Sequence, residues 1–454
     1  MDAIEEFVRS LGLDAYLVGG AVRDEVLGLE SKDADFLVLG VDAERLRAAL
    51  KPHGKVEELV VAAKPVGMRL YPRDRRIRAL APAGIEFAPP RIERSTGPGR
   101  HDFEIVVDAS ASVEEDLRRR DFTINAMARR LEDGELVDPF GGRDDLARAV
   151  LRTVSPNGFE EDPLRIVRGL RFVSQLDLEP ETATLAQMHE HAAAVGLVSG
   201  ERIGGGLAAD GMGELSKLLL GPRPRKALRL ALDTGVLVAI VPEFEPTVGF
   251  DVESDDHSDP LEEHVLGVVQ AAADAGATLP VRLAALLHDL GKPGCPQGQR
   301  HEERGARIAG RVLRRLRYPN TLREWVVRIV RFHPVRLDHT DAVAARRMLA
   351  RYGDGLAFAL LDHWHADLAG REQNPRVSAK LSRLADFRLV VEQELESPHR
   401  LADLAVDGTD LIELGYQPGP ALGRALRELL HEVVERPELN ERETLLARAE
   451  ELRP

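Results

Sequence analysis

The sequence predicts an α+β protein, with a mixed sheet and helices at its N-terminal end and a long all-helical region after it. Short apolar runs with strand spacing recur through residues 1–150. After the turn DPFGG (138–142), apolar residues follow helical spacing to the end of the chain. At 454 residues the chain is too long for one hydrophobic core, so we expect several domains.

The expected strands and breaks divide the chain. Glycine- and proline-rich breaks separate the later helices, and we place domain boundaries near residues 145, 230 and 395. The expected strands are residues 15–18, 34–39, 66–70, 84–88 and 103–107. The expected domains are residues 1–145, 146–230, 231–395 and 396–454.

Composition narrows the class of protein. The net charge is −15, from 61 basic and 76 acidic residues, which argues against a polyanionic partner. However, residues 64–100 and 118–130 are dense in arginine and could bind phosphates. The single cysteine, Cys295, excludes an intramolecular disulfide and agrees with a reducing compartment. Because the acidic N-terminus lacks a signal-peptide pattern and no apolar run could span a bilayer, we expect a cytoplasmic protein without a membrane partner.

The first candidate site lies in a strand–turn–helix–strand unit near the N-terminus. Asp33 and Asp35 are two apart in an expected strand, so their side chains point to the same face. Neighbouring carboxylates repel unless they share cations, and two Mg²⁺ ions about 4 Å apart are a common device for displacement at phosphorus. Gly19 and Gly20 let a phosphate approach the backbone at a helix start, with Arg23 one turn later. Together these features predict a nucleotidyltransferase.

Other polar residues of the first domain have two interpretations each. Glu86, in an expected strand, is a candidate third carboxylate or a solvent-facing strand residue. Arg120, Asp121 and Asn125 have the spacing to contact phosphate, ribose hydroxyl and backbone. The alternative is an N-capped helix that begins near Asp121 or Thr123.

A row of arginines follows a helix start. Asp162 precedes a proline suited to the first helical position, and Arg165, Arg168 and Arg171 recur every three residues along one helix face. An aspartate accepts a hydrogen bond from the exocyclic amine of a base, and an arginine donates to a ring nitrogen or carbonyl. Together they could read the pairing edge of a base without a nucleic-acid template. Helix capping is the competing explanation for Asp162.

These motifs resemble the class II tRNA nucleotidyltransferase (CCA-adding enzyme) and bacterial poly(A) polymerase superfamily. The resemblance runs from about residue 14 to the C-terminus. It implies a polymerase-beta-like nucleotidyltransferase head, an elongated helical neck, an HD domain and a helical, RNA-binding tail. The matching strings are GGAVRD (19–24), KDADF (32–36), RRDFTINAMA (119–128), DPFGG (138–142) and EDPLRIVRGLRF (161–172).

The resemblance also implies residue roles. Asp162 and Arg165 would act as the protein template for CTP and ATP. The implied catalytic residues, which bind two Mg²⁺ ions, are Asp33, Asp35 and Glu86. The implied nucleotide-binding residues are Gly19, Gly20, Arg23, Arg120, Asp121, Asn125, Asp162, Arg165 and Arg168. The family's flexible segment, which helps to switch specificity, would contain Arg91, Glu93 and Arg94.

One stretch departs from the family pattern. The family has two residues between the strings ERI and ELxKLL, whereas this chain has the glycine-rich residues 204–213. Each glycine costs a helix about 1 kcal/mol relative to alanine. The insertion leaves the roles of Arg202 and Glu214 open.

A second candidate site lies in the helical region. Histidine and aspartate suit divalent transition metals or Mg²⁺, and adjacent His288 and Asp289 are typical of metal-dependent phosphohydrolases. The stretch resembles an HD domain, which implies activity on cyclic 2′,3′-phosphates or phosphates at RNA ends. The alternative is a scaffold that has lost its metal. His363 and His365 are further candidate ligands, but we expect them to be surface histidines. The implied metal ligands are His264, His288, Asp289 and Asp367, with His301 and His333 assisting.

The predicted function is template-independent addition of C, C and A to the 3′ end of tRNA from CTP and ATP. A poly(A) polymerase would share every motif, but the acidic total charge and the lack of a basic extension argue against it. An enzyme that adds only CC or only A stays open because of the insertion. An alternative of another class is an HD phosphohydrolase with a non-catalytic RNA-binding head, which Asp33, Asp35 and the arginine row disfavour. The sequence does not decide between a monomer and a homodimer.

Overall fold

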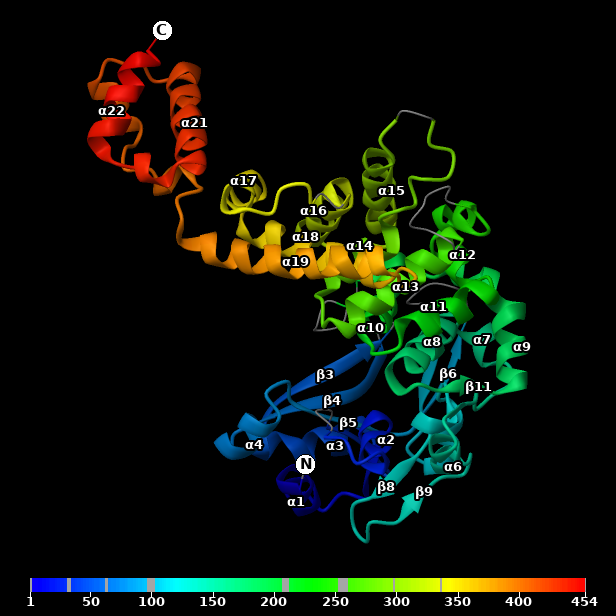
Figure 1. Cartoon of the computed structure of the whole chain (residues 1–454). Helices are drawn as coiled ribbons and strands as arrows, with labels where there is room; N and C mark the ends of the chain where they lie inside the picture. Colours follow the sequence, from blue (N-terminus) through cyan, green and yellow to red (C-terminus); the bar gives the residue numbers. More distant parts are fainter. Residues whose placement is uncertain are drawn as a thin grey trace. The chain divides into compact units, whose positions relative to one another are not determined.

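The computed structural model describes residues 2–30, 34–61, 64–95, 103–205, 212–251, 260–296, 299–334 and 337–453 (Figure 1). The chain forms two compact units. One is Met1–Glu245 with Arg315–Tyr318, and the other is Pro246–Arg314 with Pro319–Pro454. The first holds a mixed sheet followed by helices and the second is helical, which confirms the predicted fold class. Within the described ranges, no helix is long and apolar enough to cross a membrane.

A seven-stranded sheet dominates the start of the first unit, in the order β3-β4-β5-β2-β1-β8-β9. β2 pairs with β5 in parallel, so Asp35 and Glu86 lie opposite each other. The remaining neighbours pair antiparallel. The strands are β1 (Ala15–Val18), β2 (Asp35–Val38), β3 (Gly54–Val61), β4 (Lys64–Pro72), β5 (Ile85–Ala88), β8 (Ala128–Arg130) and β9 (Leu136–Val137).

Continuous apolar runs explain the central strands β1 and β2. β1 is buried throughout, and Phe36 of β2 stacks on Phe87 of β5 with ring centroids 5.7 Å apart. Helices pack on this sheet; for example, α3 contacts β4. The helices of this part are α1 (Asp2–Ser10), α2 (Gly20–Val26), α3 (Ala43–Leu50), α4 (Arg75–Leu80), α5 (Val113–Arg118) and α6 (Gly142–Ala147).

Six strands of the described residues were not predicted: β3, β6 (Arg91–Ser95), β8, β9 and the short pair β10 (Val150–Leu151) and β11 (Glu179–Pro180). The edge strand β3 carries the polar run KVEEL, and strand β6 reads RIERS, so neither has the apolar signal of a buried strand. β6 pairs antiparallel with β7 (Phe103–Val107) in a separate two-stranded sheet. Residues 91–95 of the segment that is predicted to be flexible form strand β6.

The helix α8 (Leu164–Leu176) organises the rest of the first unit. Its apolar side is buried. The ring centroid of Phe122 lies 6.2 Å from that of Phe159 and 5.8 Å from that of Phe172. Gly169 allows this packing, because a Cβ there would lie 2.8 Å from the Phe122 ring. The other helices of this part are α7 (Gly158–Glu161), α9 (Thr182–His191), α10 (Glu214–Leu220), α11 (Pro224–Asp233) and α12 (Val236–Ile240).

The two ends of the glycine-rich insertion meet. After a π-helical turn at Glu201–Gly205, the Gly213 N–H donates to the Gly204 carbonyl at 2.8 Å. Ser216 donates to the same carbonyl at 3.0 Å. A Cβ at Gly205 would overlap the Arg317 carbonyl, and a Cβ at Gly213 would overlap that of Ile203. Glycine is therefore needed here for close backbone approach.

The second unit is a stack of helices with a further core near its C-terminal end. α13 packs on α14 and α18, and α14 on α16. In the last core, Tyr416 donates to the Ala449 carbonyl at 2.7 Å. The four-domain division stays a prediction. The helices are α13 (Leu261–Asp274), α14 (Leu279–Leu287), α15 (His301–Arg315), α16 (Asn320–Phe332), α17 (Ala342–Tyr352), α18 (Asp354–Ala369), α19 (Pro375–Gln393), α20 (Gly408–Glu413), α21 (Pro420–Glu435) and α22 (Arg442–Glu451).

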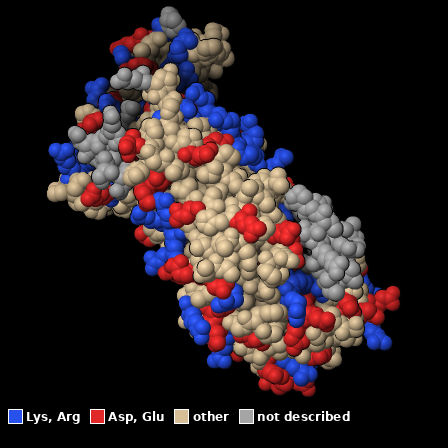
Figure 2. Space-filling view, turned by 90° about the vertical axis from the view of Figure 1, so that its right-hand side faces the viewer, with Lys and Arg blue, Asp and Glu red and all other residues tan. Residues whose placement is uncertain are grey.

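Charges of both signs share the surface. On the face shown in Figure 2, lysines and arginines lie interspersed with aspartates and glutamates. The net charge of −15 is therefore a poor guide to where phosphates could bind, and local clusters matter more.

Candidate functional site

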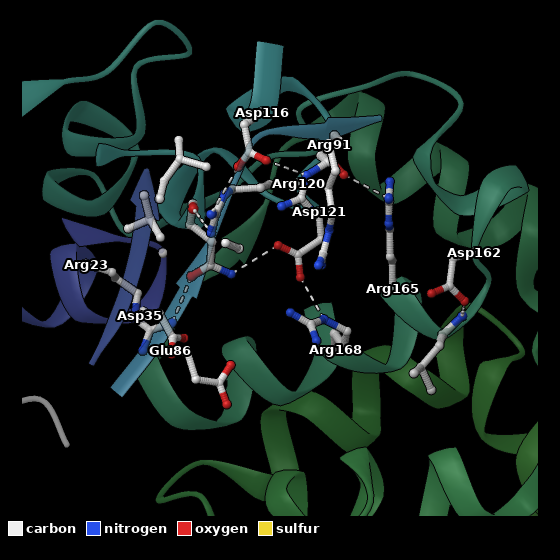
Figure 3. A pocket seen from close by; sticks show the side chains of 18 of the residues that line it. Arg23, Asp35, Glu86, Arg91, Asp116, Arg120, Asp121, Asp162, Arg165 and Arg168 are labelled. Carbon is white, nitrogen blue, oxygen red and sulfur yellow. Dashed lines mark hydrogen bonds and ion pairs between the residues drawn. The ribbon is translucent and has the colours of Figure 1, made fainter. Parts of the chain in front are cut away.

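A cavity of about 750 Å³ in the first unit brings together the predicted site residues of the sheet and of α8 (Figure 3). Asp33 lies outside the described residues. The predicted residues that line the cavity are Gly19, Gly20, Arg23, Asp35, Glu86, Arg120, Asp121, Asn125, Asp162, Arg165 and Arg168.

The carboxylates of the cavity come from neighbouring parallel strands. Asp35 begins β2 and is exposed, and Glu86 lies opposite it on β5. Arg69 of β4 donates to Glu86 through Nε at 3.1 Å and also through Nη2. Arg69 therefore neutralises Glu86, one of the carboxylates predicted to bind cations.

The turn between β1 and α2 requires glycine for two reasons. Gly19 has a φ of +69°, a conformation that side chains disfavour. A Cβ at this position would also lie 2.6 Å from Nη1 of Arg120. The Arg120 guanidinium therefore packs directly over the turn, where it donates to the Asn125 carbonyl at 3.4 Å and pairs with Asp116 at 3.4 Å.

A chain of hydrogen bonds links α2 to α8 across the cavity. Arg23 donates to Oδ1 of Asn125 at 2.8 Å, and Nδ2 of Asn125 donates to Oδ1 of Asp121 at 3.1 Å. Nε of Arg168 donates to Oδ2 of Asp121 at 2.7 Å. Burial alone would raise the pKa of Asp121, but the Arg168 charge and the hydrogen bonds lower it to about 2. Asp121 is therefore a fixed anion that positions Arg168 directly and Arg23 through Asn125.

Asp116 is a buried residue of this cavity that the sequence analysis missed. Its carboxylate pairs with Arg119 at 2.9 Å as well as with Arg120. Burial opposes ionisation, but the two arginines hold its pKa below the usual range. The capping box of Ser112 and Glu115 fixes the start of α5. Asp116 precedes the two arginines by three and four residues, and this helix spacing was the sequence signal that could have predicted the ion pairs.

The predicted base-reading residues are engaged within the protein. Asp162 accepts from Arg202 at 2.8 Å and from the Leu164 N–H at 3.2 Å. Nη2 of Arg165 donates to the Arg119 carbonyl at 2.9 Å. One oxygen of Asp162 thus accepts from the first residue of α8, although Pro163 and not Asp162 is at the N-cap position, and the other oxygen faces Arg202.

The insertion does not separate its flanking residues from α8. Arg202 reaches Asp162, and Glu214 lies 3.2 Å from Arg171. Arg171 also lies over the Phe172 ring at 4.3 Å. Both residues whose roles the sequence left open therefore contact the predicted base-reading helix or its start.

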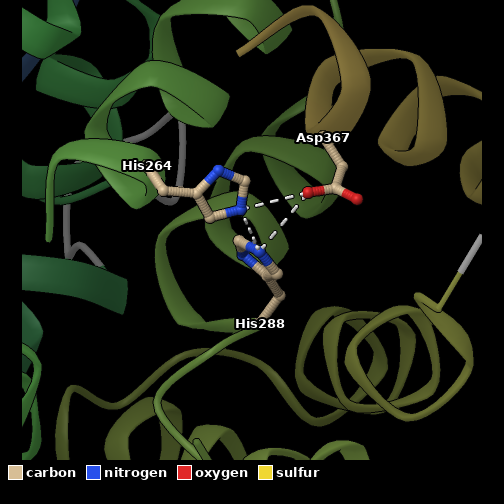
Figure 4. Close-up of side chains that lie close together, drawn as sticks. All are labelled: His264, His288 and Asp367. Atoms are coloured by element: carbon tan, nitrogen blue, oxygen red, sulfur yellow. Dashed lines mark hydrogen bonds and ion pairs between the residues drawn. The ribbon is translucent and has the colours of Figure 1, made fainter. Parts of the chain in front are cut away.

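A second cluster lies in the helical unit, where His264, His288 and Asp367 converge (Figure 4). Nε2 of His264 lies 3.1 Å from Oδ1 of Asp367 and 3.4 Å from Nε2 of His288. All three side chains are buried. Burial lowers the pKa of His288, and a neutral imidazole is the form that binds metal.

Asp289 joins this trio to a second one. Its Oδ2 lies 3.1 Å from Nε2 of His288, and its Oδ1 lies 3.5 Å from Nε2 of both His301 and His333. Although burial opposes ionisation, His288 and Lys292 hold the pKa of Asp289 well below its usual range. The two trios, His264–His288–Asp367 and Asp289–His301–His333, each have the donor set of a metal site.

The expectation for His363 was wrong. Its side chain is 0% exposed, and its ring lies 5.2 Å from that of His288 and 5.8 Å from that of His333. The string HWH looks polar in sequence, but helix spacing turns only His365 outward. Burial holds the pKa of His363 well below its usual value, so it is a neutral packing partner of the cluster.

Models of known protein families match the parts of the chain that carry both candidate sites. The model of the poly A polymerase head domain matches residues 15–152, that of a probable RNA and SrmB-binding site of polymerase A matches residues 177–247, and that of the HD domain matches residues 261–386. The multifunctional CCA protein of Ralstonia nicotianae is 36% identical over 356 residues, which cover 75% of this chain and 77% of that protein. This chain belongs to the CCA-adding enzyme and poly(A) polymerase family.

Solved structures of CCA-adding enzymes agree in fold. The Bacillus stearothermophilus CCA-adding enzyme in complex with CTP matches with a TM-score of 0.70 and 26% identity, over 99% of this chain and 95% of that chain. The Thermotoga maritima CCA-adding enzyme complexed with tRNA matches with a TM-score of 0.59 and 21% identity, over 99% of this chain and 94% of that chain. The second likeness concerns the fold alone. The predicted membership of the CCA-adding enzyme family is confirmed.

Proposed function

We propose that this CCA tRNA nucleotidyltransferase extends the 3′ end of tRNA by C, C and A, using CTP and ATP bound in the cavity of the first unit. The observation that carries the proposal is the chain Arg23–Asn125–Asp121–Arg168, which holds cations at two sides of one polar cavity beside Asp35. Multifunctional CCA proteins and CCA-adding enzymes are its relatives.

The reaction is attack of the terminal 3′-hydroxyl on the α-phosphate, with pyrophosphate as the leaving group. Arg23 and Arg120 would hold the triphosphate beside the Gly19 turn. Asp35, together with Asp33, would hold two Mg²⁺ ions. When bound, these ions would neutralise charge on the reacting phosphates. Catalysis by this chain's own residues is then chiefly positioning of the two reactants.

Asp162 and Arg165 would select the base. Cytosine and adenine both carry an exocyclic amine on the pairing edge, beside a ring nitrogen that accepts a hydrogen bond. Uracil and guanine carry a carbonyl oxygen in place of that amine. The Asp162 carboxylate can accept only from an amine, and Arg165 can only donate. This pair would therefore accept CTP and ATP and reject UTP and GTP. In this structure, without a base, Arg165 donates to the Arg119 carbonyl and Asp162 accepts from Arg202.

An Asp162→Asn variant tests the selection. An asparagine can still accept from the Leu164 N–H, so the helix start is kept. Its amide can donate to the carbonyl of UTP, so we expect discrimination between CTP and UTP to fall by at least about tenfold. The control is Glu160→Gln, an exposed position on α7. Unchanged ratios of CTP to UTP incorporation would contradict the assignment.

The second unit would carry phosphohydrolase activity on RNA 3′ ends. Each of its two trios would hold a divalent ion, either a transition metal or Mg²⁺, and Asp289 of one trio contacts His288 of the other. When bound, such ions would activate water and polarise a phosphate. Lys292, 2.6 Å from Asp289, and Arg371, 2.8 Å from Asp367, add positive charge where a phosphate would bind.

Metal content and hydrolysis test this second activity together. We expect the purified chain to hold divalent metal and to open adenosine 2′,3′-cyclic phosphate. We expect Asp289→Asn to lose both, whereas the exposed control Asp386→Asn retains both. Hydrolysis that survives Asp289→Asn would contradict the proposal.

A cytoplasmic location, where the tRNA substrate is made, is part of this proposed function.

A further inference from the structure

A cavity of about 380 Å³ lies beside the histidine–aspartate cluster and is outside the sites described so far. It shares Pro334 and Asp338 with the roughly 500 Å³ cavity into which Asp289 and Asp367 open. Its wall residue Phe332 directly precedes His333 in the chain, so the cavity adjoins the cluster. A ligand whose phosphate lies in the cluster could extend into this cavity.

The walls of this cavity suit a nucleobase. Phe332 and Tyr352 have ring centroids 5.0 Å apart, and the Arg351 guanidinium lies 5.8 and 5.2 Å from them. Arg351 is exposed and, within the described part of the chain, makes no ion pair. Flat aromatic and guanidinium surfaces are the surfaces on which single-stranded bases stack.

Trp364 completes the aromatic wall of the cavity. Its side chain lines the cavity and is 5% exposed, yet its indole N–H has no acceptor among the described residues. Because Trp364 lines the cavity, its indole ring offers a further flat surface for a base.

An arginine groove continues from the same cavity. Arg331 lines both the cavity and a neighbouring groove of about 430 Å³. Arg307, Arg311 and Arg314 of α15 line this groove at spacings of four and three residues, which place them on one helix face. Arg323 of α16 faces them. Such a row suits the successive phosphates of a strand, not a single nucleotide.

We propose that the cavity of Phe332, Arg351, Tyr352 and Trp364 binds the 3′-terminal base of an RNA strand, with the preceding phosphates along the arginine groove. The terminal phosphate would then lie at the histidine–aspartate cluster. That last step rests on the proposed phosphohydrolase function, whereas binding of the base does not.

Tryptophan fluorescence of the full chain tests the proposal directly. The chain has two tryptophans, Trp325 and Trp364, so Trp325→Phe leaves the cavity residue as the sole reporter. The probes are adenosine 3′-thiophosphate and a triadenylate that ends in 3′-thiophosphate, because a thiophosphate resists hydrolysis. We expect saturable quenching by both, with the trinucleotide binding about tenfold more tightly because it adds phosphate contacts.

Variants in the same background separate the two parts of the site. Loss of a stacking surface in Arg351→Ala should weaken both probes about tenfold, and Arg307→Ala with Arg311→Ala should weaken only the trinucleotide. The exposed control Arg376→Ala should change neither. Absence of saturable quenching, or an unchanged affinity in Arg351→Ala, would overturn the base site. Equal affinity for the two probes would overturn the assignment to an RNA strand.

Hydrolysis assays on the same preparations separate this proposal from the previous one. Quenching without hydrolysis of adenosine 2′,3′-cyclic phosphate would retain the base site and reject the phosphohydrolase. Hydrolysis without quenching would retain the phosphohydrolase and reject the base site.

Discussion

At the scale of single residues, buried charge pairs shape the nucleotide cavity. Asp116 and Asp121 are both buried and both face arginines, so their carboxylates stay ionised. They fix Arg120 and Arg168 before any nucleotide binds. Removing one partner of such a pair leaves an uncompensated charge, which is why single substitutions here should have large effects.

Gly19→Ala tests the close approach of Arg120 to the phosphate turn. The new Cβ would lie 2.6 Å from Nη1 of Arg120 and would also strain a residue with positive φ. We expect nucleotide incorporation to fall at least about tenfold through weaker triphosphate binding, measured as KM for CTP. Gly12 also has a positive φ, of +64°, with nothing within 4 Å of an added Cβ, so Gly12→Ala is the control for substitution of a glycine with positive φ. Equal losses in the two variants would contradict the role given to Arg120.

Asp121→Asn tests the ionised state of the central carboxylate. The folded-state pKa of about 2 lies below the ordinary 3.8, so the stabilisation is present above pH 3.8 and is lost as pH falls towards 2. At neutral pH it amounts to about 2 kcal/mol of unfolding free energy. We expect denaturant unfolding to show this deficit in the variant at pH 7, and a smaller one at pH 3. The exposed control Asp144→Asn should show neither, and a deficit independent of pH would contradict the electrostatic explanation.

At the scale of elements, local patterns predicted more than long-range pairings. β1 and β7 were predicted with their observed bounds, and the motif residues Gly19 and Asp35 line the cavity because a short strand–turn–helix unit positions them. The pairings of Glu86 with Arg69 and of Glu214 with Arg171 depend on which strands and helices become neighbours. Sequence spacing carries no signal for such contacts.

The burial of His363 and the closure of the insertion were missed for the same reason. The HWH string is polar, and only the packing of α18 against other helices decides which histidine is enclosed. In the sequence, the glycines of the insertion indicate a break in a helix. In the structure they allow close approach of the backbone to Ile203 and Arg317. Gly213 meets Ile203 on the other side of the insertion, and Gly205 meets Arg317, which is distant in the sequence.

Gly213→Ala tests whether the closed ends of the insertion support the cavity. A Cβ there would lie 2.4 Å from the Ile203 carbonyl oxygen, so the ends would have to separate. We expect a lower thermal midpoint and weaker incorporation, because Glu214 and Arg202 would shift from their partners on and before α8. The control Gly196→Ala meets a neighbour only at 3.4 Å. Full activity of Gly213→Ala would contradict this view of the insertion.

At the scale of the whole molecule, the first unit is completed by a segment distant in sequence. Arg315–Tyr318 belongs to this unit, where the Tyr318 hydroxyl hydrogen bonds with Ser216 at 2.8 Å and the Gly205 N–H donates to the Leu316 carbonyl at 2.9 Å. Tyr318 is buried. The part of the chain that carries the nucleotide cavity is therefore not contained in one continuous stretch.

Tyr318→Ala tests this completion in the full chain. Truncating a buried aromatic side chain costs about 3–5 kcal/mol, and Ser216 would lose its partner. We expect calorimetry to show a lower midpoint for the first unit and incorporation to weaken at elevated temperature. Tyr318→Phe, which keeps the ring, should lose only about 1 kcal/mol. Identical melting of Tyr318→Ala and the unaltered chain would contradict the division into units.

The measurement that tests the central claim most directly is incorporation on tRNA transcripts that end before CCA, resolved at single-nucleotide length. We expect growth by two nucleotides with CTP alone and by three with CTP and ATP, and no growth in an Asp33→Ala/Asp35→Ala variant. A long ladder with ATP alone would make the chain a poly(A) polymerase, and a stop at two with both nucleotides would make it a CC-adding enzyme. Either result, or growth that survives loss of both aspartates, would contradict the account.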